Sequence, residues 1–297
     1  DAAEQVLARA RRKLFAAREQ RIRPGRDDKV LVSWNALMIK GLAHAARIFD
    51  RPDWLAAARE AADFIRTRMV RDGRLLASYT NGGAKLNAYL DDHAFLLDAL
   101  LELLQAGYRA EDLAFARSLA DALMARFEDT ERGGFFFTSH DHERLIHRPK
   151  AGHDQATPSG NGVAAFALQR LAHLLGESRY LAAAERTLAW FYPRLSQQPA
   201  GFMSLQAVLD EYLTPPTILI LRGPPEDVAT WQRTLSAQFL RRTVAVGLPN
   251  DVEGVPPGLA KPPSAQVNAW ICQGVKCMAP ELDLKQVLRL CKAEQVV

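Results

Sequence analysis

The chain has 297 residues, of which 48% are hydrophobic and 24% are charged, and these values are ordinary for a soluble globular protein. Its 38 basic and 34 acidic residues leave a net charge of only +4, so composition points to no nucleic-acid partner. The sequence contains no apolar run long enough to span a bilayer and no signal-peptide pattern. Three cysteines do not make a disulfide framework, and we therefore expect a cytoplasmic protein without a membrane partner.

The first segment, residues 2–19, has apolar residues at helical spacing and precedes a turn at Pro24-Gly25. It also begins the most basic part of the chain. Because no stacking aromatics alternate with its arginines, we interpret this charge as a solvated helix face and not as a nucleic-acid surface.

A helical hairpin followed by an extended loop then recurs three times, with a period of roughly sixty residues. The predicted hairpins comprise helices 34–49 and 54–70, helices 90–104 and 111–127, and helices 159–175 and 178–195. The second helices resemble one another, as WLAAAREAADFI, LAFARSLADALM and YLAAAERTLAWF show. Such repeats are typical of toroids and solenoids built from helix pairs.

The first helix of each pair is apolar nearly all round and should be buried, whereas the second is amphipathic and should face water. This pattern predicts a mainly α fold, a partial α/α barrel with inner and outer helices. The inner helices of such a barrel are parallel, so their N-termini share one rim. Three hairpins with one extra helix on either side are too few for a closed ring of twelve helices, and we expect an open arc.

The pattern changes after residue 201. One more helix, 202–213, ends at Pro215-Pro216, and strand-like runs at 217–221 and 243–246 enclose a helical segment, 224–240. A final helix is expected at 282–293. We therefore divide the chain into a helical-hairpin portion, 1–214, and a small C-terminal α/β appendage packed on it, 215–297.

Polar or aromatic residues gather at the start of every predicted inner helix. They are Asp28, Lys29, Trp34 and Asn35 at the first, Asp91, Asp92 and His93 at the second, and Arg148, His153, Asp154, Thr157, Ser159 and Asn161 at the third. Each group has a structural alternative, because serine and aspartate cap helix N-termini and adjacent opposite charges neutralise each other at a surface. A shared rim would instead join the three groups into one polar site.

Two carboxylates in different environments can provide the acid and the base of one reaction. Burial at a helix start raises the pKa of Asp92 while the helix dipole lowers it, and Asp154 in its loop should ionise more readily. We hypothesise Asp92 as acid and Asp154 as base, with His93 as a third catalytic candidate. An aromatic beside an amide, as at Trp34-Asn35, suits a sugar ring. The ligand-binding candidates are Asp28, Lys29, Trp34, Asn35, Arg148, Thr157, Ser159 and Asn161.

Several familiar signals are absent from the sequence. We find no P-loop, no dinucleotide-binding glycine pattern, no zinc-ligand spacing and no nucleophile elbow, so we predict neither a cofactor nor a metal. Cys272 and Cys277 lack the spacing of a redox motif, which favours a structural or incidental pair over a catalytic one.

Four strings occur in an order that resembles the spermatogenesis-associated protein 20 family of thioredoxin-domain-containing proteins. They are RPGRDDKVLVSWNALMI, YLDDHAFLLDALLEL, GGFFFTSHDHERLIHRPK and HDQATPSGNGVAAFALQRLA. The resemblance implies the C-terminal part of an (α/α)6 barrel similar to N-acylglucosamine 2-epimerases and six-hairpin glycosidases. It also implies that a thioredoxin-like domain and the earlier barrel hairpins lie outside this chain.

Two functions follow as expectations. The first is a carbohydrate-active barrel that binds a sugar or sugar-like ligand at the rim, as an epimerase, an isomerase or a glycoside hydrolase. The second is a non-catalytic scaffold that binds a protein or supports the thioredoxin-like domain. The expected partners are accordingly a sugar-like small molecule, the missing N-terminal part of the same protein, or a second copy of the chain.

Overall fold

A computed structural model describes residues 1–143, 145–274 and 276–293. Its helices are α1 (Ala2–Glu19), α2 (Val32–Phe49), α3 (Pro52–Arg68), α4 (Leu90–Ala106), α5 (Ala110–Arg126), α6 (Gly160–Leu175), α7 (Ser178–Gln197), α8 (Met203–Leu213), α9 (Pro225–Ser236) and α10 (Leu284–Ala293), with a 3-10 turn η1 (Pro199–Gly201). Its strands are β1 (Val30–Leu31), β2 (Val70–Arg71), β3 (Arg74–Thr80), β4 (Gly83–Asn87), β5 (Thr217–Gly223), β6 (Thr243–Pro249), β7 (Asn268–Gln273) and β8 (Lys276–Cys277).

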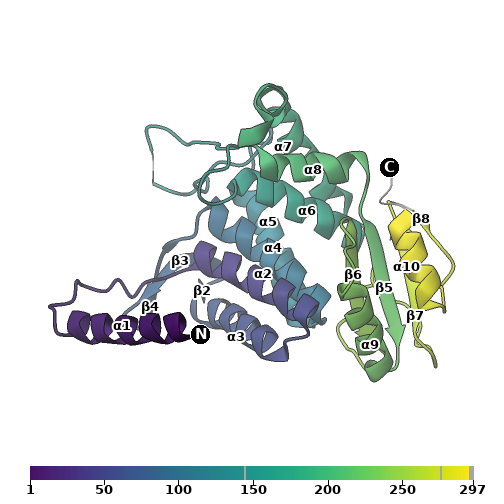
Figure 1. The fold of residues 1–297 in the computed structure, drawn as a ribbon. Coiled ribbons are helices and arrows are strands. Elements are labelled where there is room, and N and C mark those ends of the chain that lie inside the picture. The colour runs from purple at the N-terminus through teal and green to yellow at the C-terminus, as the bar shows by residue number, and fades with distance from the viewer. Residues whose placement is uncertain (144, 275, 294–297) are drawn as a thin grey trace.

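The three predicted hairpins are confirmed as α2–α3, α4–α5 and α6–α7. Helix α4 packs between α2 and α6, and α8 packs against α6, so these four helices form a row (Figure 1). The outer helices α3, α5 and α7 each pack mainly on the inner helix that precedes them. The fold is therefore a mainly α, partial α/α barrel, as predicted.

Burial follows the predicted helix types in α3 and α4 but not in the inner helix α2, which buries only the stripe Val32, Ala36, Ile39, Ala43 and Ala46. Helix α3 buries a single stripe, Ala58, Ala62 and Ile65, whereas α4 buries nearly its whole circumference. The inner helix α4 is not purely apolar, however, because it also buries Asp98 and Glu102. Charged side chains at this depth require ionic or hydrogen-bonding partners, which neighbouring helices supply.

A small antiparallel sheet precedes the N-terminal ends of α2 and α4. Strand β3 pairs with β1, β2 and β4, and β1 leads directly into α2. The β3–β4 turn has positive φ angles at Asn81 (50°) and Gly82 (79°), which is the hairpin turn that an Asn-Gly pair favours.

The C-terminal unit packs at the opposite end of α4. Its sheet has the order β6-β5-β7-β8, with β5 and β6 parallel and connected through α9 (Figure 1). The predicted strand-helix-strand unit is present, whereas β7 and β8 were not predicted. One face of the sheet joins the core of the hairpins, and α9 and α10 cover the other. Cys272 and Cys277 form a disulfide across β7 and β8. The boundary at 214/215 stays a prediction.

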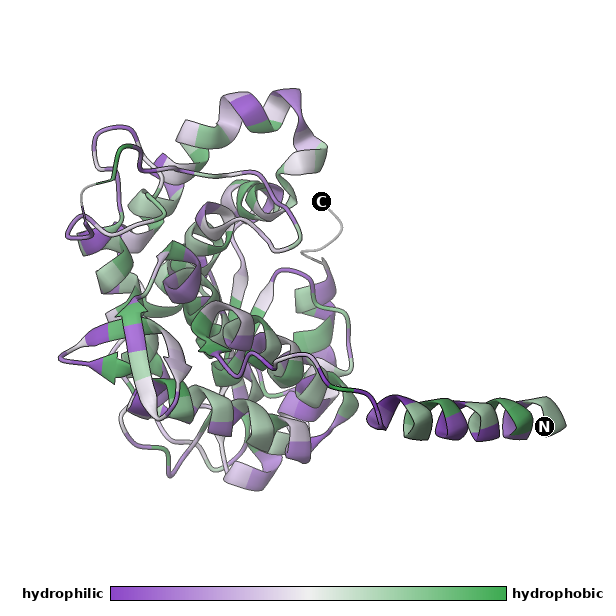
Figure 2. Ribbon diagram, turned by 90° about the vertical axis from the view of Figure 1, so that its left-hand side faces the viewer, coloured by the Kyte–Doolittle hydropathy of each residue, from purple (hydrophilic) through white to green (hydrophobic). Residues whose placement is uncertain are grey.

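Helix α1 has the predicted bounds but packs differently from every other helix. It projects away from the body of the molecule, as Figure 2 shows, and none of its residues is buried. No helix in the described part of the chain combines the length and hydropathy needed to cross a bilayer.

Candidate functional site

The N-termini of α2 and α4 are joined by the carboxylate of Asp92. Its Oδ1 accepts the backbone N–H of Ser33 at 2.9 Å, and its Oδ2 accepts that of Tyr89 at 2.9 Å, which completes a capping box. Burial raises the pKa of Asp92 above its usual value, and the two N–H groups act in the opposite direction. Both oxygens of this predicted acid are thus occupied by helix starts.

Asp154 makes the equivalent connection between α6 and α8. Its Oδ1 accepts the N–H of Ser159 at 2.7 Å and the hydroxyl of Ser204 at 2.5 Å. Its Oδ2 accepts the N–H of Ser204 at 2.9 Å. Asp92 joins the starts of α2 and α4, and Asp91 lies against Gly160 at the start of α6, so the three predicted inner-helix starts lie at one rim, together with the start of α8.

Asn161 is fully buried and holds the loop that precedes α6. Its Oδ1 accepts the N–H of Phe135 at 2.6 Å, and its Nδ2 donates to the carbonyl groups of Phe135 and Ala151, both at 2.9 Å. Ser159 is the N-cap of α6 and donates its hydroxyl to Ala151 at 3.1 Å. Asn161 and Ser159, both predicted to bind a ligand, therefore hold the backbone of Phe135 and Ala151 in place at the rim.

Asp91 differs from its neighbour Asp92, because its carboxylate makes no hydrogen bond or ion pair with any described residue. It lies against the start of α6, where a Cβ added at Gly160 would be 2.1 Å from its Oδ1. Burial and the adjacent charge of Asp92 raise the pKa of Asp91 to about 6. A half-buried carboxyl group with that pKa can either donate or accept a proton near neutral pH.

His93 faces the interior of the helical layers. Its ring is 3% exposed, lies 4.9 Å from that of Phe127, and contacts the Tyr89 carbonyl through Nδ1 at 2.9 Å. Burial lowers its pKa to about 4, so the imidazole is neutral at pH 7. His93 therefore has the surroundings of a core histidine.

The remaining predicted residues are spread over the same end of the molecule. Trp34 is 67% exposed at the start of α2, and Asn35 donates to the Leu31 carbonyl at 2.8 Å. Asp28 and Lys29 are exposed and pair with sequence neighbours, and within the described ranges no ion pair links them to the other candidates.

Arg148 and Thr157 belong to the loop before α6. Arg148 donates to the Thr138 carbonyl at 2.5 Å, and the Thr157 carbonyl accepts the N–H of Gln155 at 3.0 Å. Among the described residues, neither side chain forms a hydrogen bond or an ion pair with Asp91 or Asp92.

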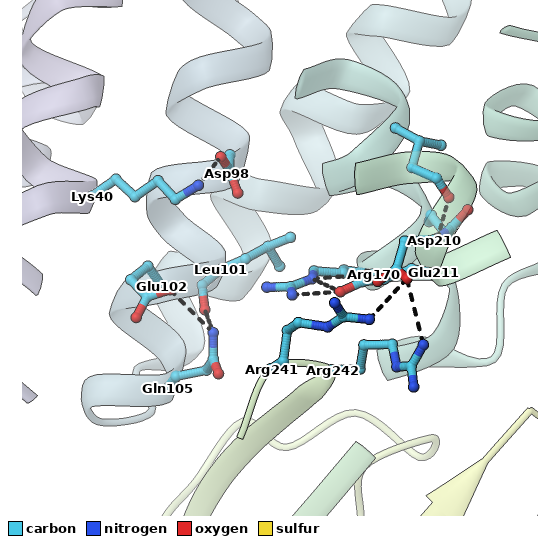
Figure 3. Close-up of polar contacts among 12 residues, drawn as sticks. Lys40, Asp98, Leu101, Glu102, Gln105, Arg170, Asp210, Glu211, Arg241 and Arg242 are labelled. Atoms are coloured by element: carbon cyan, nitrogen blue, oxygen red, sulfur yellow. Dashed lines mark hydrogen bonds and ion pairs between the residues drawn. The ribbon is translucent and has the colours of Figure 1, made fainter. Parts of the chain in front are cut away.

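Three ion pairs between inner helices were missed by the sequence analysis. Figure 3 shows two of them, Lys40 with Asp98 and Arg170 with Glu211, each with an N–O distance of 2.6 Å; the third is Arg47 with Glu102, also 2.6 Å. Burial opposes the charge of Glu102, but a hydrogen bond from His44 and the charge of Arg47 lower its pKa to about 2. The sequence did contain a signal for these pairs. The spacing of Asp91, Asp98 and Glu102 places three acidic residues on one side of α4, which an apolar helix would not require.

Ligands of a metal ion are not assembled at this rim. Among the described residues, no group of three or more histidine, cysteine, aspartate or glutamate side chains is arranged to hold a metal.

Comparison with known sequences confirms the resemblance to the spermatogenesis-associated protein 20 family. The human protein of that name is 30% identical over 220 residues, covering 70% of this chain and 28% of the human protein. An uncharacterised Caenorhabditis elegans protein is 25% identical over 292 residues, covering 93% of this chain and 40% of that protein. The chain thus spans well under half the length of these curated relatives. No family model matches it.

Solved structures show a partial likeness. The cellobiose 2-epimerase of Bacillus thermoamylovorans aligns with a TM-score of 0.48 and 14% identity over 57% of this chain and 46% of the epimerase. A GH76 alpha-mannanase of Bacteroides thetaiotaomicron aligns with a TM-score of 0.48 and 13% identity over the same shares. At these values, neither a ligand nor a reaction carries over to this chain.

Proposed function

We propose that this chain, a relative of the spermatogenesis-associated protein 20 family, contributes a sugar-binding rim in which Asp91 transfers a proton. The observation that carries the proposal is the contrast between two adjacent carboxylates. Asp92 accepts a backbone N–H group with each of its two oxygens, whereas Asp91 accepts no hydrogen bond from the described residues and has a pKa of about 6. An acid that is not used by the fold remains available to a ligand.

An exposed aromatic side chain at the adjacent helix start supports a sugar-like ligand. Trp34 and Asp91 directly flank the hydrogen bond between Ser33 and Asp92 in sequence, on two neighbouring helix starts. The indole of Trp34 is 67% exposed, so its face is free to stack on the apolar face of a sugar ring. Hydroxyl groups of that ring would hydrogen-bond to Asp91, because a carboxylate accepts several such bonds.

Asp91 therefore replaces Asp92 as our candidate acid, and Asp92 and Asp154 become positioning residues. Each holds two inner-helix starts together through backbone N–H groups. A protonated Asp91 would donate to a glycosidic oxygen as the glycosidic bond breaks, or to the ring oxygen of a hemiacetal as the anomeric hydroxyl loses its proton and the ring opens, which are the first steps of glycoside hydrolysis and of an epimerase or isomerase reaction.

The test combines binding with turnover. A panel of neutral mono- and disaccharides is screened by thermal shift, because a ligand that binds only the folded state raises the melting temperature. Turnover of each binding sugar is then compared between the wild type and Asp91→Asn. We expect Asp91→Asn to retain binding and lose at least about a hundredfold in turnover. Wild-type turnover in Asp91→Asn would refute the assignment.

A scaffold is the second candidate function, and the exposure of α1 and α2 favours it. Helix α1 buries none of its residues and exposes Leu14 (70%) and Phe15 (57%), while α2 exposes Met38 (61%) beside Trp34. Such surfaces fit a helical partner, either additional hairpins of the same protein or a second copy. If no sugar binds while α1 and α2 acquire protection in a complex, the scaffold function is favoured.

A further inference from the structure

A pocket lined by charged and aromatic side chains lies between α7 and the loop that precedes α6, apart from Asp91 and Asp92. Its volume is about 550 Å³, and its walls include Phe136 of the loop and Trp190 of α7. The charged groups around it are Asp129, Arg132, Arg148, Lys150 and Arg194, with His147 beside them. Four permanent cations thus surround one carboxylate.

The carboxylate of Asp129 forms an ion pair with Lys150. Asp129 Oδ2 is 2.7 Å from Lys150 Nζ, which also lies 3.9 Å from the centre of the Trp190 ring. Arg148 lies 4.1 Å from the centre of the Phe136 ring and donates to a neutral carbonyl, that of Thr138. Arg148 therefore forms no ion pair with a described carboxylate, although the charge of Asp129 favours its protonated form.

Arg132 and Arg194 add two further charges without a carboxylate partner among the described residues. Arg194 is exposed in the last turn of α7, and Arg132 is exposed in the turn after Asp129. Burial lowers the pKa of Arg148 below its usual value, in keeping with a cation held in an unfavourable setting. An anion entering the pocket would relieve this excess of positive charge.

The walls of the pocket are fixed before any ligand arrives. The buried amide of Asn161 bonds to backbone groups of Phe135 and Ala151, which adjoin Phe136 and Lys150 in sequence. Lys150 also donates to the Gly133 carbonyl at 3.0 Å. Arg148 and the aromatic walls are therefore held by the framework that caps α6, and a ligand need not order them.

We propose that this pocket binds the oxyanion group, phosphate or carboxylate, of a small molecule. Guanidinium groups match the planar geometry of both anions and bind them with charge-assisted hydrogen bonds. The faces of Phe136 and Trp190 provide apolar contact for the remainder of the ligand. This inference is independent of the proposed function, because it involves neither Asp91 nor Trp34.

Isothermal titration of the chain tests the proposal with four probes: inorganic phosphate, glucose 6-phosphate, glucuronate and neutral glucose. We expect at least one anion to bind and glucose to bind at least tenfold more weakly. Arg194→Gln should weaken anion binding about tenfold, because it removes one charge-assisted interaction. The matched control is Arg68→Gln, since Arg68 is likewise exposed in the last turn of an outer helix, α3, without a described ion pair.

The outcomes separate the sources of the anion. Tighter binding of glucose 6-phosphate than of inorganic phosphate identifies a phosphate ester, and preference for glucuronate identifies a sugar acid. Equal affinity for all anions identifies a site for the free ion. The proposal fails if no anion binds. It also fails if Arg194→Gln binds every anion as tightly as the wild type and the control Arg68→Gln do. Inorganic phosphate carries no sugar ring, so a loss of its affinity in Arg194→Gln but not in Arg68→Gln distinguishes this pocket from the rim.

Discussion

The carboxylate of Asp92 and the backbone N–H of Ser33 form a hydrogen bond of 2.9 Å across 59 positions of sequence. This bond fixes the start of α4 against the start of α2. Its strength depends on a charged acceptor and a partly buried donor, and such bonds contribute more to stability than neutral ones. The same carboxylate is thereby withdrawn from the solvent-facing chemistry of the rim.

Replacing Asp92 should consequently destabilise the fold. Asp92→Ala leaves the N–H groups of Ser33 and Tyr89 without their acceptor, and we expect the free energy of unfolding to fall by roughly 2–4 kcal/mol. Urea unfolding followed by circular dichroism measures the change. The control is Asp91→Asn, which replaces a half-buried carboxylate that bonds to no described residue and should not lower the free energy of unfolding at pH 7. Equal losses in both variants would contradict the distinct roles of the two residues.

The raised pKa of Asp91 has a specific effect on stability. The pKa of Asp91 is about 6 in the folded state and 3.8 in the unfolded chain, so stabilisation from its protonated form is complete only below about pH 3.8 and is lost as the pH rises through 6. Relative to Asp91→Asn, the wild type should lose up to about 3 kcal/mol of unfolding free energy between pH 4 and pH 6.5. Chemical unfolding of both proteins at half-unit pH steps gives this difference, and parallel profiles would mean that the pKa is not raised.

The buried ion pair of Arg170 and Glu211 should respond strongly to the loss of one partner. The Glu211 side chain is 3% exposed and accepts from Arg170 at 2.6 Å, so Glu211→Gln leaves a buried guanidinium without its counter-charge. We expect a loss of about 3–5 kcal/mol in unfolding free energy. The exposed ion pair of Asp53, 60% exposed, with Arg51 at 2.6 Å provides the control, since Asp53→Asn should leave the free energy of unfolding nearly unchanged. The interpretation is wrong if the two losses are alike.

Helix α1 should govern association without contributing to stability. It buries no residue, and its apolar side chains include Leu7 (55% exposed) and Leu14 (70% exposed). Light scattering should show concentration-dependent self-association of the chain, reduced in a variant carrying Leu7→Gln and Leu14→Gln. The melting temperature of that variant, measured at low concentration, should match the wild type. A monomeric wild type at all concentrations would contradict this expectation.

The repeat made the helical part of the fold predictable from sequence. Apolar spacing located the hairpins to within a few residues, and parallel inner helices placed Asp92, Asp154 and Asn161 at one rim. Strand β7 was missed because it follows a loop rich in proline and glycine and its residues, NAWICQ, do not alternate between buried and exposed positions. It pairs with β5, some fifty residues earlier in the chain, and local patterns carry little information about pairing at that distance.

The role of each rim residue was harder to predict than its position. Sequence alone does not distinguish Asp91 from Asp92, since both are acidic residues in the first turn of one helix. The distinction arises from a one-residue rotation of about 100° around the helix, which points Asp92 at Ser33 and Asp91 at Gly160. The tertiary neighbours determine which carboxylate caps a helix and which remains free.

The most direct test of the rim assignment is a titration of Asp91 by carboxyl-detected NMR, with and without the sugar that gives the largest thermal shift. The Asp91 resonance is identified by its loss in Asp91→Asn. We predict a pKa of about 6 in the free protein and a displaced pKa in the sugar complex, because a ligand that hydrogen-bonds to one protonation state shifts the equilibrium between the two. A pKa of about 6 that is identical with and without a saturating sugar would contradict a proton-transferring role of Asp91 at this rim.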